Sequence, residues 1–371
     1  MGLNPEFCII IISMAKALFA TILVLLIFGL VVLSSAGIVE GQKKFGSAYY
    51  YLNHQLLLGV LPGLALMLLF SKLDYKIWKK VSILVLVGSL FLLAMVFVPT
   101  FGQGLKGATR WLSIGGFSFQ PSEVLKLSLI IYLAAWFGNR DERIRNWTYG
   151  MAPFFLVLSF IALLLALQPD IGTLMVVTMI SLAIYFFAGS EMKHMLIVLA
   201  VIIGAFVLMI AVEPYRLDRI KTFIDPSVDP RGISYQLNQS LIAIGSGGMF
   251  GNGFGESVQK FGFLPEVIHD SIFAVVVEEL GFVGAVFLIG LFVFLAFLMV
   301  WTANRTTDKF GKLIVMGMAT WIIGQAFLNI SAISGLAPLT GIPLPFVSYG
   351  GTAMMVLLAG MGIVLNVAKR A

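Results

Sequence analysis

Residues 245–281 read GSGGMFGNGFGESVQKFGFLPEVIHDSIFAVVVEELG. This stretch begins glycine-rich, turns at Leu264-Pro265-Glu266 and becomes apolar directly after Asp270. Apolar runs of roughly 17 to 25 residues recur along the chain, and a helix of that length crosses the hydrocarbon core of a bilayer. The stretch therefore predicts a membrane-spanning helix that begins with a carboxylate at the water boundary.

The composition excludes a water-soluble globular protein. Of the 371 residues, 60% are hydrophobic and 11% are charged, and the mean hydropathy is +1.01. The apolar runs are too long for the alternating strands of a membrane β-barrel, so we expect an all-α, polytopic membrane protein. The single Cys8 and three separated histidines predict neither a disulfide nor a protein-built metal site, and nothing indicates a nucleic-acid partner.

Ten candidate spans occur, at residues 15–36, 52–70, 80–98, 121–137, 151–168, 171–188, 194–213, 270–300, 311–332 and 346–368. An even number places both termini on one side. Lys and Arg gather in the loops of that side, so the positive-inside rule makes it cytoplasmic. The long connection between spans seven and eight, residues 214–269, then lies outside. We expect one membrane domain and set residues 1–13 aside as a leader.

One candidate site lies where the fourth span begins. Pro121 suits the first helical position, and Glu123 at the third can satisfy free amide donors of the helix. Lys126 follows one turn later among apolar residues, where an ammonium needs a carboxylate, a wet cavity or an anionic ligand. Either Glu123 and Lys126 pair with each other at i,i+3, or they bind a substrate.

Asp170 belongs to a tight turn, Gln168-Pro169-Asp170, between two predicted spans. Its carboxylate either caps the following helix or partners Lys126 or Arg110 at the mouth of a cavity. Both alternatives remain open from the sequence.

The last span is preceded by GIPLPFVSYGGT, residues 341–352. Two prolines followed by Ser348 and paired glycines predict an irregular start to this span. Such backbone is tolerated in a membrane only where it packs on protein or lines a wet cavity.

Asp270 stands at a helix start, where it is either an N-cap or a reactive carboxylate. The glycines before it lack the GxxxxGK[ST] pattern of a phosphate cradle, so they indicate flexibility and close packing. Glu278 and Glu279 follow about 12 Å deeper along a helix, and we expect them to be buried packing or pairing groups, not catalysts.

Seven segments together resemble one family: RWLSIGGFSFQPSEVLK, QPDIGT, PYRLDRIKTFIDP, SYQLNQSLIAIGSGG, GNGFGESVQKFGFLPE, DSIFAVVVEELG and PLPFVSYGG. They occur in order between about Gly102 and Gly362. The chain resembles the shape, elongation, division and sporulation family of peptidoglycan polymerases. The GESVQK segment is more similar to the division branch than to the elongation branch.

This resemblance implies a ten-span glycosyltransferase that polymerises lipid II outside the cytoplasmic membrane. The implied partners are a class B penicillin-binding transpeptidase and other membrane proteins of division or elongation. The family's proposed catalytic aspartate falls on Asp270. Two positions depart from the family pattern: His269 is displaced by one residue, and Thr340 stands where some members have a lysine.

The residue types suit this chemistry. Transfer from a lipid pyrophosphate needs a base for the incoming sugar hydroxyl and charge neutralisation for the leaving group, and we expect Asp270 to be the base. A divalent cation, Mg²⁺ or Mn²⁺, can bridge the pyrophosphate without leaving a sequence signature. The predicted substrate-binding residues are Arg110, Lys126, Glu123, Asp170, Arg216, Arg219, Lys260, Glu266 and Ser348.

Two other functions fit the same pattern. Ionisable residues inside spans, namely Lys126, Glu278 and Glu279, are also expected of a flippase that moves lipid II across the membrane. A non-catalytic scaffold for division proteins is the third alternative. The charged groups predicted on the external side favour the enzyme.

Overall fold

The computed structural model describes residues 5–105, 108–114, 117–138, 151–197, 199–200, 204, 221, 223–225, 227, 229–230 and 232–371. The helices before the first strand are α1 (Pro5–Ala36), α2 (Ile38–Phe45), α3 (Tyr50–Gln55), a π-helical segment η1 (Leu56–Val60), α4 (Leu61–Lys72) and α5 (Lys76–Met95). The strands are β1 (Gly102–Leu105), β2 (Ala108–Ile114) and β3 (Phe117–Phe119). The later helices are α6 (Pro121–Phe137), α7 (Ala152–Leu167), α8 (Ile171–Phe187), α11 (Tyr235–Ser246), α12 (Ile272–Arg305), α13 (Lys309–Ile333) and α14 (Gly351–Ala368).

The protein is a multi-pass α-helical membrane protein. In the described part of the chain, six helical segments are long and apolar enough to cross a membrane, and α7 and α8 are shorter apolar helices. Helices occupy nine of the ten predicted spans. The remaining one, residues 194–213, falls largely outside the described residues. The predicted fold class is therefore confirmed.

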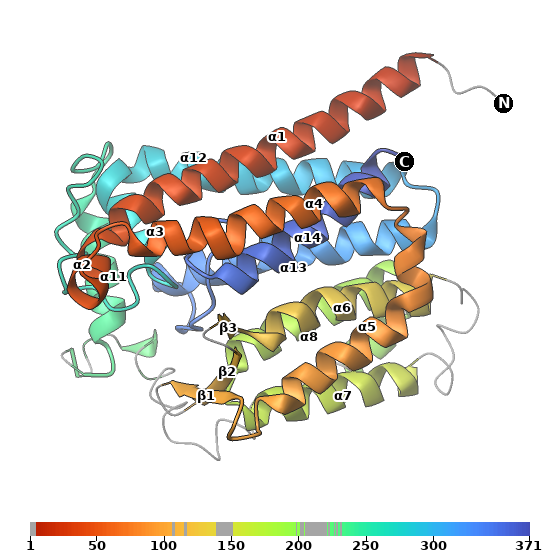
Figure 1. Cartoon of the computed structure of the whole chain (residues 1–371), viewed down its shortest axis with the longest axis horizontal. Helices are drawn as coiled ribbons and strands as arrows, with labels where there is room; N and C mark the ends of the chain where they lie inside the picture. Colours follow the sequence, from red (N-terminus) through yellow and green to blue (C-terminus); the bar gives the residue numbers. More distant parts are fainter. Residues whose placement is uncertain are drawn as a thin grey trace.

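The spanning helices lie side by side, and the two ends of the bundle differ (Figure 1). The start of α1 and the C-terminus lie at one end, as the even number of spans predicts. The other end carries α2, α11, the three-stranded sheet and the segment that leads into α12. The large predicted loop and the polar turns therefore gather at one end of the molecule.

Close helix contacts form the core around α14, which is buried along almost its whole length. It packs on α4 and α13. A Cβ added to Gly362 would come within 2.5 Å of the Met67 carbonyl oxygen, so the two backbones approach too closely for any side chain at that position. Helices in lipid associate mainly through close van der Waals packing, because no hydrophobic drive acts between them. Small residues permit this packing, since they let the backbones approach.

The long helix α12 is broken at Gly281, whose φ is 68°. The break leaves backbone groups without helical partners, and the glycine-rich segment before Asp270 supplies them. The Phe282 and Val283 amides donate to the carbonyl oxygens of residues 248 and 249, and the carbonyl oxygens of residues 278 and 279 accept from the amides of 252 and 253. The predicted packing role of these glycines is confirmed.

Two of these glycines are needed for the close approach. A Cβ on Gly247 would lie 2.0 Å from the Val277 carbonyl oxygen, and one on Gly251 would lie 2.1 Å from that of Glu279. Gly251 also has a φ of 79°, a conformation that side chains disfavour. The loop is thus fixed against the helix that Asp270 precedes.

Two elements were not expected from the sequence. The predicted external loop after α5 contains an antiparallel sheet, in which Leu112 lies opposite both Gly102 and Phe119. The long connection 214–269 contains α11, which packs on α12. The chain remains dominated by helices, because the strands are short and confined to one turn.

Candidate functional site

Asp270 lies just before α12 and is 8% exposed. Ser271 is the N-cap position of the helix, so the alternative that Asp270 caps it is wrong. The Nε2 of Gln236, on α11, donates to Asp270 Oδ2 at 3.1 Å and to Ser271 Oγ at 3.1 Å. A side chain from α11 therefore fixes the orientation of the carboxylate.

The backbone around Asp270 is fastened to the segment that precedes α14. Asn329 Nδ2, on α13, donates at 2.8 Å both to the Asp270 carbonyl oxygen and to that of Ile342. Ser348 Oγ donates to the His269 carbonyl oxygen at 2.5 Å, and the Tyr349 amide donates to that of Ile268 at 2.8 Å. The irregular segment predicted there is confirmed, and it packs on protein.

Glu123 and Lys126 form an ion pair of 2.9 Å, and their side chains are 4% and 2% exposed. Lys126 Nζ also donates to Gln325 Oε1 at 3.1 Å and lies 4.9 Å from the centre of the Trp321 ring. The predicted pairing at i,i+3 is confirmed. Pro121 opens α6 as expected, which sets both side chains on the inner face of that helix.

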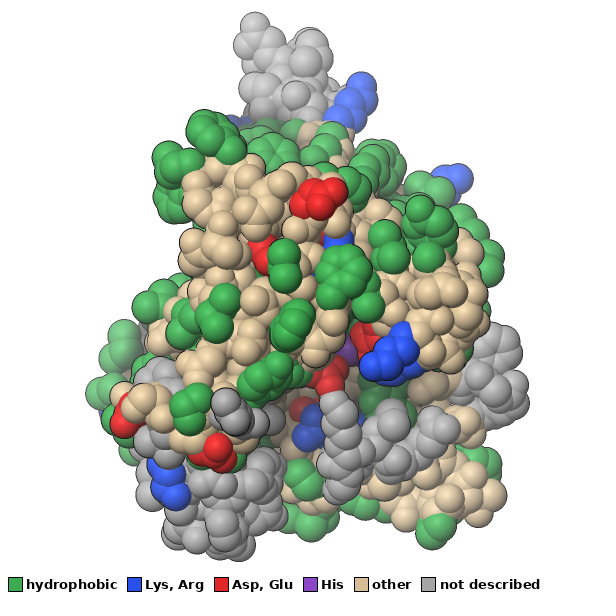
Figure 2. Space-filling model, turned by 90° about the vertical axis from the view of Figure 1, so that its left-hand side faces the viewer, with side chains coloured by type: hydrophobic (Ala, Val, Ile, Leu, Met, Phe, Trp, Pro, Cys, Tyr) green, Lys and Arg blue, Asp and Glu red, His purple; other side chains and the backbone are tan. Residues whose placement is uncertain are grey.

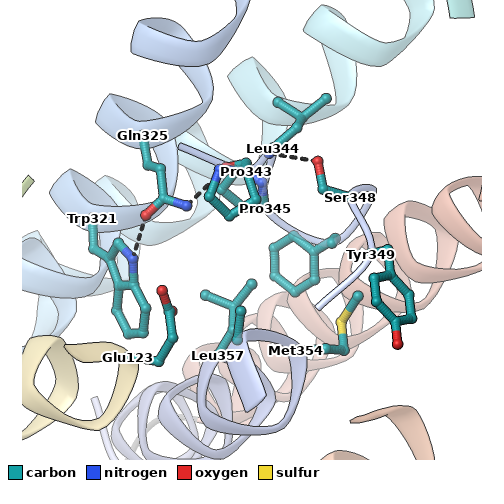
Figure 3. A pocket seen from close by; sticks show the side chains of 12 residues that line it. Glu123, Trp321, Gln325, Pro343, Leu344, Pro345, Ser348, Tyr349, Met354 and Leu357 are labelled. Carbon is teal, nitrogen blue, oxygen red and sulfur yellow. Dashed lines mark hydrogen bonds between the residues drawn. The ribbon is translucent and has the colours of Figure 1, made fainter. Parts of the chain in front are cut away.

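A small cavity of about 20 Å³ lies between Glu123 and the segment that precedes α14 (Figure 3). Glu123 and Trp321 stand on one side of it, and the segment containing Pro343, Leu344 and Ser348 stands on the other. Glu123, Gln325 and Ser348 contribute polar groups to its lining, and the other lining side chains are mostly apolar. This volume admits about one water molecule, so the cavity is a small polar gap beside the ion pair.

One face of α13 links the two charged regions. Gln325 accepts from Lys126 and donates to the Pro343 carbonyl oxygen at 2.8 Å, while Asn329, one turn later, holds Asp270 and Ile342. The ion pair and the aspartate are therefore positioned on the same segment before α14, from opposite ends of one helical turn.

Arg110 and Asp170 meet at the same end of the molecule. Arg110 Nη1 lies 3.8 Å from Asp170 Oδ1, and the guanidinium also donates to the carbonyl oxygens of Gln168 and Pro169. Asp170 Oδ1 accepts from the Thr173 amide at 3.3 Å, so it caps α8. Asp170 therefore both caps α8 and partners Arg110, while its predicted place at the mouth of a cavity stays a prediction. The Arg110 side chain remains 34% exposed and can reach a ligand.

Lys260 is a correction to the predicted set. Its ammonium lies 2.9 Å from Glu279 Oε1, donates to Ser35 Oγ at 2.8 Å, and is 2% exposed. Glu278 accepts from Ser257 Oγ at 2.5 Å. The expectation that the two glutamates are buried packing or pairing groups is confirmed, and Lys260 pairs with Glu279 instead of facing a pyrophosphate.

Glu266, another predicted substrate-binding residue, lies in the turn before Asp270. It is half-buried with a φ of 51°, and its carbonyl oxygen accepts from the His269 amide at 2.9 Å. It therefore shapes the turn before Asp270. Ser348 binds backbone, as described above. Arg216 and Arg219 lie outside the described residues, so their predicted contacts stay predictions.

The family model described as a cell cycle protein, FtsW/RodA/SpoVE, matches residues 15–371. The chain belongs to the FtsW/RodA/SpoVE family. The resemblance found in the seven sequence segments is thereby confirmed.

Relatives and solved structures of the FtsW/RodA/SpoVE family extend the match over nearly the whole chain. The probable peptidoglycan glycosyltransferase FtsW of Geobacter sp. (strain M18) is 37% identical over 94% of each chain. The stage V sporulation protein E of Bacillus subtilis is 35% identical over 99% of this chain and 97% of its own.

Two solved structures share the fold. A chain from a peptidoglycan synthase complex that coordinates polymerization and crosslinking has a TM-score of 0.78 at 27% identity, covering 96% of this chain and 97% of its own. RodA of Thermus thermophilus has a TM-score of 0.70 at 28% identity, covering 95% of each chain. The architecture described above is therefore that of the FtsW/RodA/SpoVE family.

Among the described residues, no three His, Cys, Asp or Glu side chains come together in a way that could hold a metal ion. The expected divalent cation therefore stays a prediction. If it binds, it does so with the substrate's phosphates supplying ligands, because Mg²⁺ commonly uses one or two carboxylates plus phosphate oxygens.

Three positioning residues escaped the sequence reasoning: Gln236, Gln325 and Asn329. Gln236 lies within SYQLNQSLIAIGSGG, one of the segments that resemble the family, but its partner is distant in the chain. Gln325 and Asn329 are four residues apart in α13, a spacing that puts two amides on one helix face. That spacing was the available signal, and an apolar span with two aligned amides points to a buried polar site.

Proposed function

We propose that this protein is a peptidoglycan glycosyltransferase that polymerises lipid II into glycan strands. The observation that carries the proposal is the arrangement around Asp270. A buried carboxylate is oriented by Gln236 and clamped through its backbone by Asn329, and both belong to a network that reaches the Glu123–Lys126 pair. The names of the FtsW relatives supply the substrate class.

In the proposed reaction, Asp270 acts as general base. It takes the proton of the acceptor sugar hydroxyl as that oxygen attacks the anomeric carbon of the donor. The bond between this carbon and the phosphate oxygen breaks, and the lipid pyrophosphate leaves with the electron pair. The leaving group is already stable as an anion, so it needs charge neutralisation more than an acid.

Arg110 is the described cation best placed to approach the pyrophosphate. It is the more exposed member of its ion pair, and its planar guanidinium can hold two phosphate oxygens at once. Lys126 is enclosed and already balanced by Glu123, so it is less accessible to the pyrophosphate than Arg110. A Mg²⁺ or Mn²⁺ ion bound with the substrate would supply further positive charge.

The proposed location follows the charge pattern of the loops. The end that carries Asp270, α11 and the sheet faces outward, and both termini are cytoplasmic. The proposed partner is a class B penicillin-binding transpeptidase, together with other membrane proteins of division or elongation. Support comes from the similar chain in a peptidoglycan synthase complex in which polymerization and crosslinking are coordinated.

The test is glycan polymerisation by purified protein in nanodiscs. Lipid II is added with and without the transpeptidase, and the products are separated on a gel. We expect polymer from the parent protein and from Asp225→Asn, a control at an exposed carboxylate. We expect none from Asp270→Asn with unchanged elution on size exclusion. Polymer at the parent rate from Asp270→Asn would remove the proposed base.

The same preparation separates the rival functions. A flippase would move labelled lipid II between the leaflets of vesicles without forming polymer. A scaffold would bind the transpeptidase and do neither. Either result in place of polymer formation overturns the proposal.

A further inference from the structure

Residues 247–263, GGMFGNGFGESVQKFGF, form a loop whose apolar side chains point outward. Phe250 is 81% exposed, Phe261 62%, and Phe254 52%. Others in the same loop are also exposed, namely Met249, Val258 and Phe263. Soluble surfaces rarely gather this many large apolar side chains, so a covering partner is implied.

The surface of this loop carries almost no charge. Its only charged residues are Glu256 and Lys260. The Lys260 side chain turns inward to Glu279 and is 2% exposed, which leaves the Glu256 carboxylate as the single exposed charge. The outer surface of the loop is therefore mainly aromatic.

The depth of the loop follows from its hydrogen bonds to α12. The apolar part of α12 after the break, residues 282–301, is about 30 Å long at about 1.5 Å per residue. This equals the thickness of a hydrocarbon core, about 30 Å. The break at Gly281 thus lies at the border between hydrocarbon and headgroups, and the loop backbone is bonded directly to it.

The exposed surface of the loop also continues onto the lipid-facing surface of α12. The Val283 amide donates to the Met249 carbonyl oxygen at 3.1 Å, and both side chains are at least half exposed. Phe282, Val286 and Phe287 extend the same surface along the helix. Figure 2 looks onto this end of the molecule and shows hydrophobic side chains standing out from it.

From these observations we infer that the loop 247–263 is a membrane anchor, whose phenylalanines enter the leaflet on the side of Asp270. The occupant is lipid, because the surface is continuous with a lipid-facing helix, lies at the border of the hydrocarbon, and offers almost no polar group to a protein partner. Phenylalanine side chains of interfacial segments bury about 5–10 Å into the boundary between headgroups and acyl chains. The anchor would hold the loop, and with it the turn before Asp270, at the height where lipid headgroups lie.

The test is depth measurement by nitroxide labels on full-length protein. The protein is first changed to Cys8→Ser, and single cysteines are introduced as Phe250→Cys and Phe261→Cys. It is reconstituted in nanodiscs of phosphatidylethanolamine and phosphatidylglycerol. Collision rates are measured with oxygen, which concentrates in lipid, and with a water-soluble nickel complex. Val293→Cys on α12, 63% exposed, is the lipid reference, and Asp225→Cys, on an exposed loop residue, is the water reference.

We expect the ratio of oxygen to nickel collisions at both phenylalanine positions to be several-fold above that at Asp225 and below that at Val293, which lies near the middle of the span. A ratio like that at Asp225 overturns the inference. So does a water-like ratio that becomes protected only when a purified transpeptidase is added, since the loop would then be a protein-docking surface. Labels at these exposed positions leave the core intact, and unchanged elution on size exclusion verifies this. The outcome does not depend on enzymatic activity.

Discussion

Replacing Lys260 by methionine tests whether this lysine is structural or binds substrate. Its ammonium and the Glu279 carboxylate are 2.9 Å apart, and each side chain is 2% exposed. Lys260→Met leaves a buried carboxylate that keeps the hydrogen bond from the Ser35 hydroxyl, at 2.6 Å. Removing one member of a buried pair costs about 3–5 kcal/mol of folding free energy, because the other charge stays desolvated. We expect a clearly lower melting temperature.

The double variant Lys260→Met/Glu279→Gln supplies the matched control. It removes both charges and keeps a group that can bond to Ser35, so we expect most of the lost stability to return. Thermal unfolding in nanodiscs is followed by tryptophan fluorescence, and lipid II polymerisation is measured on the same samples. Because Lys260 is enclosed with Glu279, the double variant should polymerise nearly as fast as the parent protein.

Three results would refute this reasoning. If Lys260→Met melts with the parent protein, the pair contributes nothing to stability. If the double variant melts with the single variant, the unpaired carboxylate is not the cause of the loss. If the double variant is stable but inactive, Lys260 acts on the pyrophosphate, as the sequence alone predicted.

Three further predictions concern the loop, the site and the opposite end of the bundle. Gly251→Ala should lower the melting temperature because its Cβ would meet a carbonyl oxygen at 2.1 Å, whereas Gly245→Ala, with open space around it in α11, should raise it slightly. Gln236→Ala should slow polymerisation at unchanged melting temperature, since Asp270 loses a donor at 3.1 Å, and Gln236→Asn should recover less than the parent rate because its amide is one methylene shorter. A hydrogen bond from the Lys76 amide and the nearby Arg370 guanidinium lower the pKa of Asp74. The ionised Asp74 therefore stabilises the fold near neutral pH, and this contribution is lost as the pH falls through the lowered pKa. Melting of Asp74→Asn should accordingly differ from the parent near pH 7 and converge with it in acid; a constant difference across this range would contradict the assignment.

Much of the fold could be predicted from the sequence because membrane insertion depends on local composition. An apolar run of spanning length must be a helix in lipid, where its backbone has no water to bond. The helix positions therefore follow without knowledge of their neighbours. Pro121 fixed the start of α6 to the residue, and two prolines before the last span marked its irregular start. The sheet after α5 was missed, since its strands are short and pair only within one external turn.

The candidate site was predictable in its residue types and less so in its pairings. Asp270 and the Glu123–Lys126 pair were found because charged groups in or beside apolar spans are costly and must have a function or a partner. Lys260 was assigned to the wrong partner, because its neighbours in the sequence are polar and glycine-rich and give no sign of the buried Glu279. Gln236 was missed because its partner is distant in the chain, and Asn329 because the spacing of two amides is a weaker signal than a charge in an apolar span.

In residues 245–281, some features were determined by the sequence alone and others only by the tertiary structure. The sequence alone determined that a helix begins after Asp270 and that glycines gather before it, because both depend on local chain chemistry. Tertiary structure decided why they are glycines: the helix breaks at Gly281, and the loop backbone must come close enough to satisfy its free amides and carbonyls. That requirement joins atoms some thirty residues apart, where a hydrogen bond unmade in a membrane costs more than the ordering of the loop.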